Sequence, residues 1–425
     1  MHKPSCRRAD IPVRRSFRWV KRLESRPERV AFRGLLRTGM SARREWCPDS
    51  AALSSRPRGR LLAFFGLILL SALSACAGSE FTAKAAPEWD ALFQRTSGWI
   101  GADGNYSIPL TRDTMLWLFS DTIVGKVQDG RRMDAHMINN SVALQHGTNA
   151  PDFFYGTTTN SQPASFITPQ HGSPRGYFWL AHGIRTARGL YFFMQRVITV
   201  RSGSPFGFKV VDGWLARVEN PDDPPPQWRI TQAQVACTEV SDQGALIFGG
   251  AVLRQGEYAY VFGGDSRPAA GKDHAPNGLV LARVPAEQLA DFAQWRFLAD
   301  GDWQGDYKKA TPVFRNVGSE FSISWLPGRR EYAAVYSDGI GGNILVRLAP
   351  ALTGPWGSPI LVYRCPEMDW PTKAFCYAAK AHPELVIAPD ELLITYVANA
   401  WDFRDLFKDS WLYWPRFVRV NLGAK

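Results

Sequence analysis

The sequence has little cysteine and none of the common metal or nucleotide motifs. Of six cysteines in 425 residues, only Cys237, Cys365 and Cys376 follow position 76. An odd number encodes no complete disulfide framework, although Cys365 and Cys376 could pair across an eleven-residue loop in an oxidising compartment. There is no CxxC pair, no HExxH, no P-loop and no dinucleotide-binding glycine fingerprint. We therefore expect neither a metal ion nor a cofactor.

Excess positive charge is missing outside the first sixty residues. Residues 1–60 hold 17 Lys and Arg against 5 Asp and Glu, a net charge of +12, whereas the whole chain carries +11, so residues 61–425 carry −1. Residues 1–60 also lack apolar periodicity, and Met40 could start a signal peptide. We interpret residues 1–60 as a basic leader that is disordered or results from a misplaced gene start. Because residues 61–425 carry no excess positive charge, we expect no nucleic-acid partner.

The hydrophobic run at residues 61–75 is short for a membrane span. It follows three arginines and ends in the letters LSAC, which resemble the lipobox of bacterial lipoproteins. We expect residues 61–75 to be a lipoprotein signal peptide and Cys76 to carry a lipid anchor; an ordinary signal with an incidental cysteine is the alternative. Ala77, in place of the Asp that often retains lipoproteins in the inner membrane, predicts secretion across the inner membrane and attachment to the outer membrane.

Helical patterns are scarce after residue 98, where the apolar runs are short, aromatic or β-branched, and bounded by turn residues. One class of strand recurs at spacings of 74, 68, 74 and 60 residues, starting at Leu116, Leu190, Tyr258, Tyr332 and Leu392. A second class follows each, at 142, 215, 281, 346 and 418. This repeat predicts an all-β fold, a five-bladed β-propeller with four-stranded blades over residues 88–422. A β-sandwich is the alternative.

The last repeat stops at its third strand and so lacks an outer strand. We expect the segment 88–100, EWDALFQRTSGWI, to supply this strand and close the ring, because closure removes two exposed sheet edges. Residues 76–87 would then be a short linker between the lipidated cysteine and the domain.

Acidic side chains occur on the strands that should line the central channel. Alternation of side chains places polar groups on one face of segments 102–110, 319–326 and 380–387. These groups are Asp103 with Asn105, Glu320, and His382 with Glu384. We expect the acids to converge on one pocket. Converging carboxyls suit glycoside hydrolysis, in which one protonates the leaving oxygen and the other activates water or attacks the sugar, because crowding keeps one of them protonated.

Each candidate also has a structural explanation. Asp103 and Asp121 are natural turn residues, Glu320 could belong to a buried ion pair, and His382 and Glu384 could be partners of each other. We retain four candidate catalytic residues and three candidate substrate-binding residues. The catalytic candidates are Asp103, Glu320, Asp121 and Glu384, and the substrate-binding candidates are Asn105, His382 and Trp325.

Several motifs together resemble a bacterial domain family of unknown function. They are GADGNYSIPL, LWLFSDT, MINNSVAL, GSEFSIS, TGPW and AHPEL. This family is similar to the five-bladed propeller glycosidases, which include arabinanases, levansucrases and β-fructosidases, and some relatives are endo-D-arabinanases. The resemblance covers about residues 88–422 and implies that Asp103 is the base or nucleophile. The acid of these enzymes is usually a Glu on a middle blade; we assign Glu320 in its place, with Glu239 as the second candidate.

The sequence thus predicts a lipid-anchored, monomeric glycoside hydrolase of arabinanase-like type that acts on a glycan. Two alternatives stay open: a propeller that binds glycans without cleaving them, and a cell-envelope scaffold that binds protein partners. A scaffold would need no converging carboxyl groups.

Overall fold

The computed structural model describes residues 81–423, apart from 171–174, 202–206, 269–274 and 387. All of them belong to one unit of the chain, Ser74–Lys425. The expected leader, signal peptide and lipidation site at Cys76 lie outside the described residues. Among the helices of the described part, none is long and apolar enough to cross a membrane.

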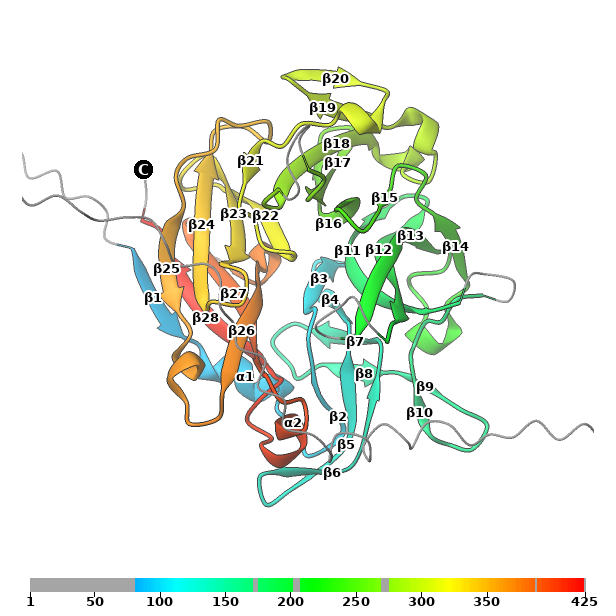
Figure 1. Cartoon of the computed structure of the whole chain (residues 1–425), viewed down its shortest axis with the longest axis vertical. Helices are drawn as coiled ribbons and strands as arrows, with labels where there is room; N and C mark the ends of the chain where they lie inside the picture. The colour runs from blue at the N-terminus through cyan, green and yellow to red at the C-terminus, as the bar shows by residue number, and fades with distance from the viewer. Residues whose placement is uncertain (1–80, 171–174, 202–206, 269–274, 387, 424–425) are drawn as a thin grey trace, which may run out of the picture. The chain divides into compact units, whose positions relative to one another are not determined.

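The described residues form an all-β fold of antiparallel sheets (Figure 1), each built mainly from consecutive strands. The first sheet contains β3 (Tyr106–Pro109), β4 (Thr114–Phe119), β7 (Ser141–His146) and β8 (Asp152–Phe154). The second contains β11 (Tyr177–Thr186), β12 (Gly189–Thr199), β13 (Phe208–Val218) and β14 (Ile230–Gln234). The third is larger and contains β15 (Glu239–Val240), β16 (Ala245–Gln255), β17 (Tyr258–Asp265), β18 (Gly278–Pro285), β19 (Arg296–Ala299), β20 (Asp302–Gln304) and β21 (Phe314–Arg315).

Two further four-stranded sheets follow along the chain. One contains β22 (Phe321–Leu326), β23 (Glu331–Ser337), β24 (Asn343–Ala349) and β25 (Ile360–Arg364). The other contains β26 (Ala374–Ala381), β27 (Glu391–Ala400), β28 (Pro415–Asn421) and β1 (Thr82–Ala85). Smaller elements are the sheet of β2 (Ser97–Ala102), β5 (Thr122–Gln128) and β6 (Arg131–Ile138), the pair β9 (Gly156–Thr157) and β10 (Pro163–Ala164), and the helices α1 (Pro87–Phe93) and α2 (Asp405–Lys408).

The recurring strands predicted from the sequence are confirmed. The first class lies in β4, β12, β17, β23 and β27, and the second class lies in β7, β13, β18, β24 and β28. The first strands of successive sheets are neighbours: β3 packs beside β11, β11 beside β16, β16 beside β22, and β22 beside β26 (Figure 1). A hydrogen bond between Ser107, in the first sheet, and His382, which follows the first strand of the last sheet, links the two ends of the series. Sheets arranged in this way around a central channel form a β-propeller.

The strand that completes the last sheet is not the segment 88–100. It is β1, which pairs with β28 from Thr82 opposite Asn421 to Ala85 opposite Val418 and lies within the expected linker 76–87. The segment 88–100 instead forms helix α1 and strand β2. Trp89 and Phe93 are four residues apart, so a helix buries both side chains against the ring of Phe417. The letters TAKA of β1 contain no large apolar side chain that would predict a strand.

The first strand of the last sheet also lies earlier than expected. It is β26, Ala374–Ala381, so the predicted segment 380–387 falls at its end. Pro383 has no N–H for the ladder and opens a short 3₁₀ turn, Pro383–Leu385. His382 and Glu384 therefore follow the strand rather than alternate along it.

Candidate functional site

Three of the predicted carboxyl groups come together at one end of the channel. Asp103 lies between β2 and β3, Asp121 follows β4, and Glu320 immediately precedes β22. The backbones of the two aspartates are joined, because the N–H of Asp103 donates to the carbonyl of Asp121 at 3.2 Å. Both Asp121 and Glu320 raise the pKa of Asp103 electrostatically. We call Asp103, Asp121 and Glu320 the carboxyl cluster.

Asp103 is held by its neighbours in both backbone and side chain. Gly104 has φ +86°, and a Cβ there would lie 2.8 Å from the backbone nitrogen of Ser120, so only glycine fits this close approach. The hydroxyl of Tyr377 donates to Oδ2 of Asp103 at 2.5 Å. Burial, followed by the charges of Asp121 and Glu320, raises the pKa of Asp103 to about 8, although hydrogen bonds from Tyr377 and Tyr413 oppose the shift. Asp103 is therefore protonated at neutral pH.

Asp121 belongs to the same cluster and is more than a turn residue. The indole N–H of Trp179 donates to its Oδ1 at 2.8 Å, and the amide of Asn139 donates to the same oxygen at 3.3 Å. Burial raises the pKa of Asp121 to about 6, and these two hydrogen bonds oppose the rise. The neighbouring sheet thus supplies a donor that holds this carboxyl group beside Asp103.

Glu320 is paired with a buried lysine. The ammonium of Lys380 lies 2.9 Å from Oε1 of Glu320, donates to the carbonyl of Ala378 at 2.9 Å, and sits 4.4 Å from the centroid of the Tyr106 ring. Lys380 is only 1% exposed. Burial lowers the pKa of Lys380, while the charge of Glu320 opposes the decrease. The ion pair proposed as the structural explanation for Glu320 is therefore present, and it lies within the cluster.

A bulge in β26 explains why the cluster has these partners. Tyr377 and Lys380 are three residues apart and would point to opposite faces of a regular strand. The register with β27 shifts between them, and Ala378 adopts φ +64°, which is uncommon for a residue with a Cβ. The bulge directs both side chains toward the cluster. Sequence alternation alone could not find either residue, because nothing in the letters YAAK marks a bulge.

Asn105, a predicted substrate-binding residue, follows Asp103 of the cluster by two residues in the sequence. It adopts φ +52° and is fully buried, and within the described residues its amide oxygen and nitrogen have no hydrogen-bond partner. Asparagine tolerates this left-handed conformation better than most residues do. Its unpaired donor and acceptor are costly unless a ligand or water completes them.

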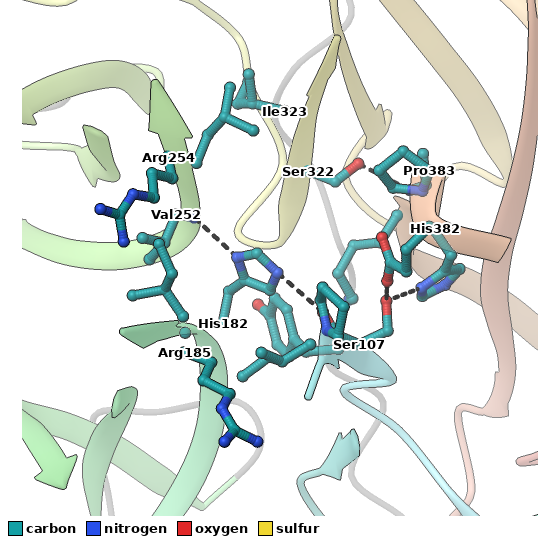
Figure 2. Close-up of a pocket in the computed structure, with 18 of the residues that line it drawn as sticks. Ser107, His182, Arg185, Val252, Arg254, Ser322, Ile323, His382 and Pro383 are labelled. Atoms are coloured by element: carbon teal, nitrogen blue, oxygen red, sulfur yellow. Dashed lines mark hydrogen bonds between the residues drawn. The ribbon is translucent and has the colours of Figure 1, made fainter. Parts of the chain in front are cut away.

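A cavity of about 470 Å³ shares Lys380 with the carboxyl cluster (Figure 2). Its lining includes Ser107, His182, Ser322, Lys380, His382 and Glu384, but none of the three carboxyl groups of the cluster. The expectation that all the acids converge on one pocket is therefore wrong for Glu384. The physical reason is that β26 ends at Ala381. His382 and Glu384 therefore lie in the turn after the strand and not on its channel-facing side.

The polar groups of this cavity satisfy one another (Figure 2). Ser107 Oγ lies 2.6 Å from Nδ1 of His382 and donates to Glu384, and Nε2 of His382 lies 2.7 Å from the hydroxyl of Thr395. Nδ1 of His182 accepts from the N–H of Val252, so its Nε2 donates to the carbonyl of Ser107 at 3.0 Å. Burial lowers the pKa of His182 to about 4 and raises that of Glu384 to about 7. Both histidines are neutral at neutral pH, since burial also lowers the pKa of His382.

Two other predicted residues lie apart from both sites. Trp325 is 40% exposed near the far end of β22, five residues beyond Glu320, and its ring packs on Tyr332 with centroids 4.8 Å apart. Glu239 lies in β15 and pairs with Arg267 at 3.2 Å. The structure brings neither to the carboxyl cluster.

Within the described residues, one group offers three side chains of a metal-binding type. Cys365, Glu367 and Cys376 are buried, and their ligand atoms lie within 4.8 Å of one another. The carboxylate is already occupied, because Tyr396 donates to it at 2.9 Å and Arg416 lies 3.1 Å away. Both cysteines are free thiols here, although they are neighbours as the sequence suggested. This arrangement does not require a metal ion.

Comparisons with known proteins identify a family and a shared fold. The family described as "Domain of unknown function (DUF5005)" matches residues 87–422. A putative hydrolase from Bacteroides ovatus is 17% identical with a TM-score of 0.63, over 82% of this chain and 93% of that one, which shows a common fold. A GH43_1 enzyme from Xanthomonas citri (13% identity, TM-score 0.41, covering 79% and 92%) and an α-L-arabinofuranosidase from Lactobacillus brevis (11%, 0.42, covering 77% and 92%) are more distant. No curated protein matches the sequence.

Proposed function

The chain belongs to the family described as "Domain of unknown function (DUF5005)", and because that description specifies no activity, we propose one from the site. The proposed protein is a five-bladed propeller, closed by the pairing of β1 with β28, that hydrolyses glycosidic bonds as a monomer. Four four-stranded sheets, together with the larger third sheet, support the number of five blades. The likeness to solved structures bears on the fold alone.

One observation supports the proposed activity: three carboxyl groups lie together, and burial and the two neighbouring acids raise the pKa of one of them, Asp103, to about 8. Glycoside hydrolysis needs a carboxylic acid and a carboxylate at the same site. The carboxyl cluster supplies both, since Asp103 has a raised pKa and Glu320 faces the ammonium of Lys380. A scaffold protein gains nothing from crowding three acids in this way, because crowding destabilises the fold.

The electrostatics support the following roles within this proposal. Asp103 acts as the proton donor to the leaving oxygen, because burial and two neighbouring acids favour its protonated form. Glu320 acts as the carboxylate that activates water or attacks the sugar, and Asp121 keeps the pKa of Asp103 high. This assignment reverses the base role that the family resemblance implies for Asp103.

A leaving-group experiment tests both the activity and the roles. Wild-type protein, Asp103→Asn and Glu320→Gln are assayed on a panel of polysaccharides and on aryl glycosides with increasingly acidic phenols. A good leaving group needs no proton, so Asp103→Asn should recover activity as the phenol becomes more acidic, whereas Glu320→Gln should not. The reverse pattern would exchange the two roles. Asp369→Asn, which changes an exposed carboxylate, is the matched control.

The same panel separates the proposal from its alternative. If the wild type binds glycans in the panel but cleaves none, the protein is a binding module and the hydrolase proposal is wrong.

We also propose that Cys76 is lipidated and holds the protein at the outer membrane, on the support of the LSAC sequence and the hydrophobic run before it. Mass spectrometry of the mature N-terminus is the direct test, and an unmodified Cys76 would contradict it.

A further inference from the structure

One loop of the described unit exposes several large aromatic side chains. It connects β27 to β28, and three of its residues are unusually exposed: Trp401 at 55%, Phe403 at 43% and Trp411 at 58%. Most tryptophans of a soluble fold bury the greater part of their surface. Two exposed tryptophans in one loop of this length therefore mark it as a binding surface rather than as part of the core.

This loop lies at the same end of the channel as the carboxyl cluster. Ala400, the last residue of β27, pairs with Ala374, the first residue of β26, so the loop begins where β26 begins. Tyr413, from the same loop, hydrogen-bonds to Asp103. The backbone N–H of Trp401 donates to the carbonyl of Lys373 at 3.2 Å, which fixes the start of the loop against the residue preceding β26.

A continuous series of rings leads from the cluster to the surface. The hydroxyl of Tyr377 contacts Asp103, and its ring lies 5.5 Å from that of Phe375, two residues earlier on β26. The ring of Phe375 in turn lies 5.0 Å from that of Trp401. Phe375 is 5% exposed and Trp401 is 55% exposed. The buried ring of Phe375 therefore packs on the inner side of the exposed Trp401 ring. This packing fixes the orientation of the Trp401 indole.

The direction of β1 disfavours a membrane as the occupant of this surface. Thr82, the first residue of β1, pairs with Asn421, whereas the loop connects to β28 at its opposite end, Pro415. The chain therefore joins the sheet at the end away from Trp401. A membrane contacted through β1 would therefore lie nearer the opposite end of the sheet from the loop.

We propose that Trp401, supported by Phe375, is a sugar-stacking platform that binds a glycan unit beside the carboxyl cluster and so selects polymeric over short substrates. This inference rests on the proposed glycoside hydrolase function. The C–H-rich face of a neutral sugar ring packs on an indole face, and the polar edges of the sugar stay in water. The ligand class is a neutral polysaccharide, held at a sugar beyond the bond that is cleaved.

The test compares Trp401→Ala with Trp325→Ala, which removes an exposed tryptophan at the far end of β22. Binding to the polysaccharide that the wild type binds most strongly is measured by affinity electrophoresis in the Asp103→Asn background, where no cleavage interferes. Trp401→Ala should weaken binding by about tenfold. Trp325→Ala should leave it unchanged, and Trp401→Phe should restore part of it.

Kinetics of the enzymes with intact Asp103 complete the test. Trp401→Ala should raise KM for the polysaccharide with kcat nearly unchanged, and should not alter kcat/KM for an aryl monosaccharide glycoside. Unchanged binding and unchanged KM in Trp401→Ala would overturn the platform but leave the hydrolase intact. Binding without cleavage by the wild type would overturn the hydrolase but leave the platform.

Two further outcomes refute the platform. Failure of the wild type to bind any glycan of the panel would do so. A loss of binding to phospholipid vesicles in Trp401→Ala, with glycan binding unaffected, would identify a membrane-contact surface instead.

Discussion

The carboxyl cluster and the Ser107–His382 cavity both place buried ionisable groups in the channel, yet their balance of charge differs. The cavity contains one carboxyl group, that of Glu384, and Ser107, His182 and His382 each have a hydrogen-bond partner. The cluster sets three carboxyl groups against one ammonium, that of Lys380. The cavity has the volume, and cationic residues outnumber its one carboxyl group, whereas the cluster crowds several carboxyl groups together. Glycoside hydrolysis depends on two carboxyl groups at one site, and of these two regions only the cluster holds more than one.

The largest expected effect separates the two regions by activity. Asp103→Asn should lower kcat on the best glycan substrate by roughly 100- to 10,000-fold, the range typical of a lost general acid. Glu384→Gln keeps the shape of the cavity and should retain most of the wild-type kcat. Initial rates of reducing-sugar release measure both. A large loss in Glu384→Gln with little loss in Asp103→Asn would move the active site to the cavity.

The second prediction separates the regions by stability. His382→Ala removes hydrogen bonds to Ser107 and Thr395 and opens a void, so it should lower the free energy of unfolding by about 3 kcal/mol. Urea denaturation measures the change. His146→Ala, which alters an exposed histidine, is the control and should shift the midpoint only slightly. An unchanged midpoint in His382→Ala would show that the cavity network is not structural.

The smallest predicted effect is the difference in stability between pH 7 and 8, at most about 1.4 kcal/mol for one group. The pKa values of Asp103 and Glu384 are raised from 3.8 and 4.5 to about 8 and about 7, so the folded state holds protons that the unfolded state releases. The free energy of unfolding should therefore fall as pH rises from 4 toward 8, by at most about 1.4 kcal/mol per pH unit for each group. Between pH 7 and 8 Asp103 contributes most among the described carboxyl groups with a raised pKa, because Glu384 is already half ionised at pH 7.

Asp103→Asn should consequently flatten the stability curve most between pH 7 and 8, and Glu384→Gln should flatten it mainly below pH 7. Thermal unfolding in buffers of constant ionic strength provides the comparison. Equal slopes in both variants above pH 7 would mean that Asp103 is not the group that retains the proton.

The sequence predicted the repeating strands because their apolar runs have a strong and regular signal, as in LWLFSDT and YAAVYSDG. It also predicted Asp103, Asp121 and Glu320 as candidate catalytic acids, since acidic residues are readily recognised beside strands that should line a channel. It missed Tyr377 and Lys380, because a bulge changes the alternation on which the prediction depends. It placed the closing strand too late, because TAKA contains no large apolar side chain and gives only a weak strand signal.

Aromatic residues show the same limit. Trp325 was chosen from its position in a strand, whereas Trp401, which packs on Phe375 near the cluster, follows a strand and had no pattern to mark it. Which tryptophan stays exposed depends on the packing of whole sheets, and a local sequence pattern does not contain that information.

The most direct test of the account is the protonation state of Asp103 in the free protein. Infrared difference spectroscopy of wild type and Asp103→Asn, recorded from pH 5 to 9, isolates the C=O stretching band of this one carboxylic acid. The account predicts a band that is present at pH 7, disappears with a midpoint near the pKa of about 8, and is absent from the variant. A spectrum in which Asp103 is already ionised at pH 5 would contradict the assignment of Asp103 as the proton donor.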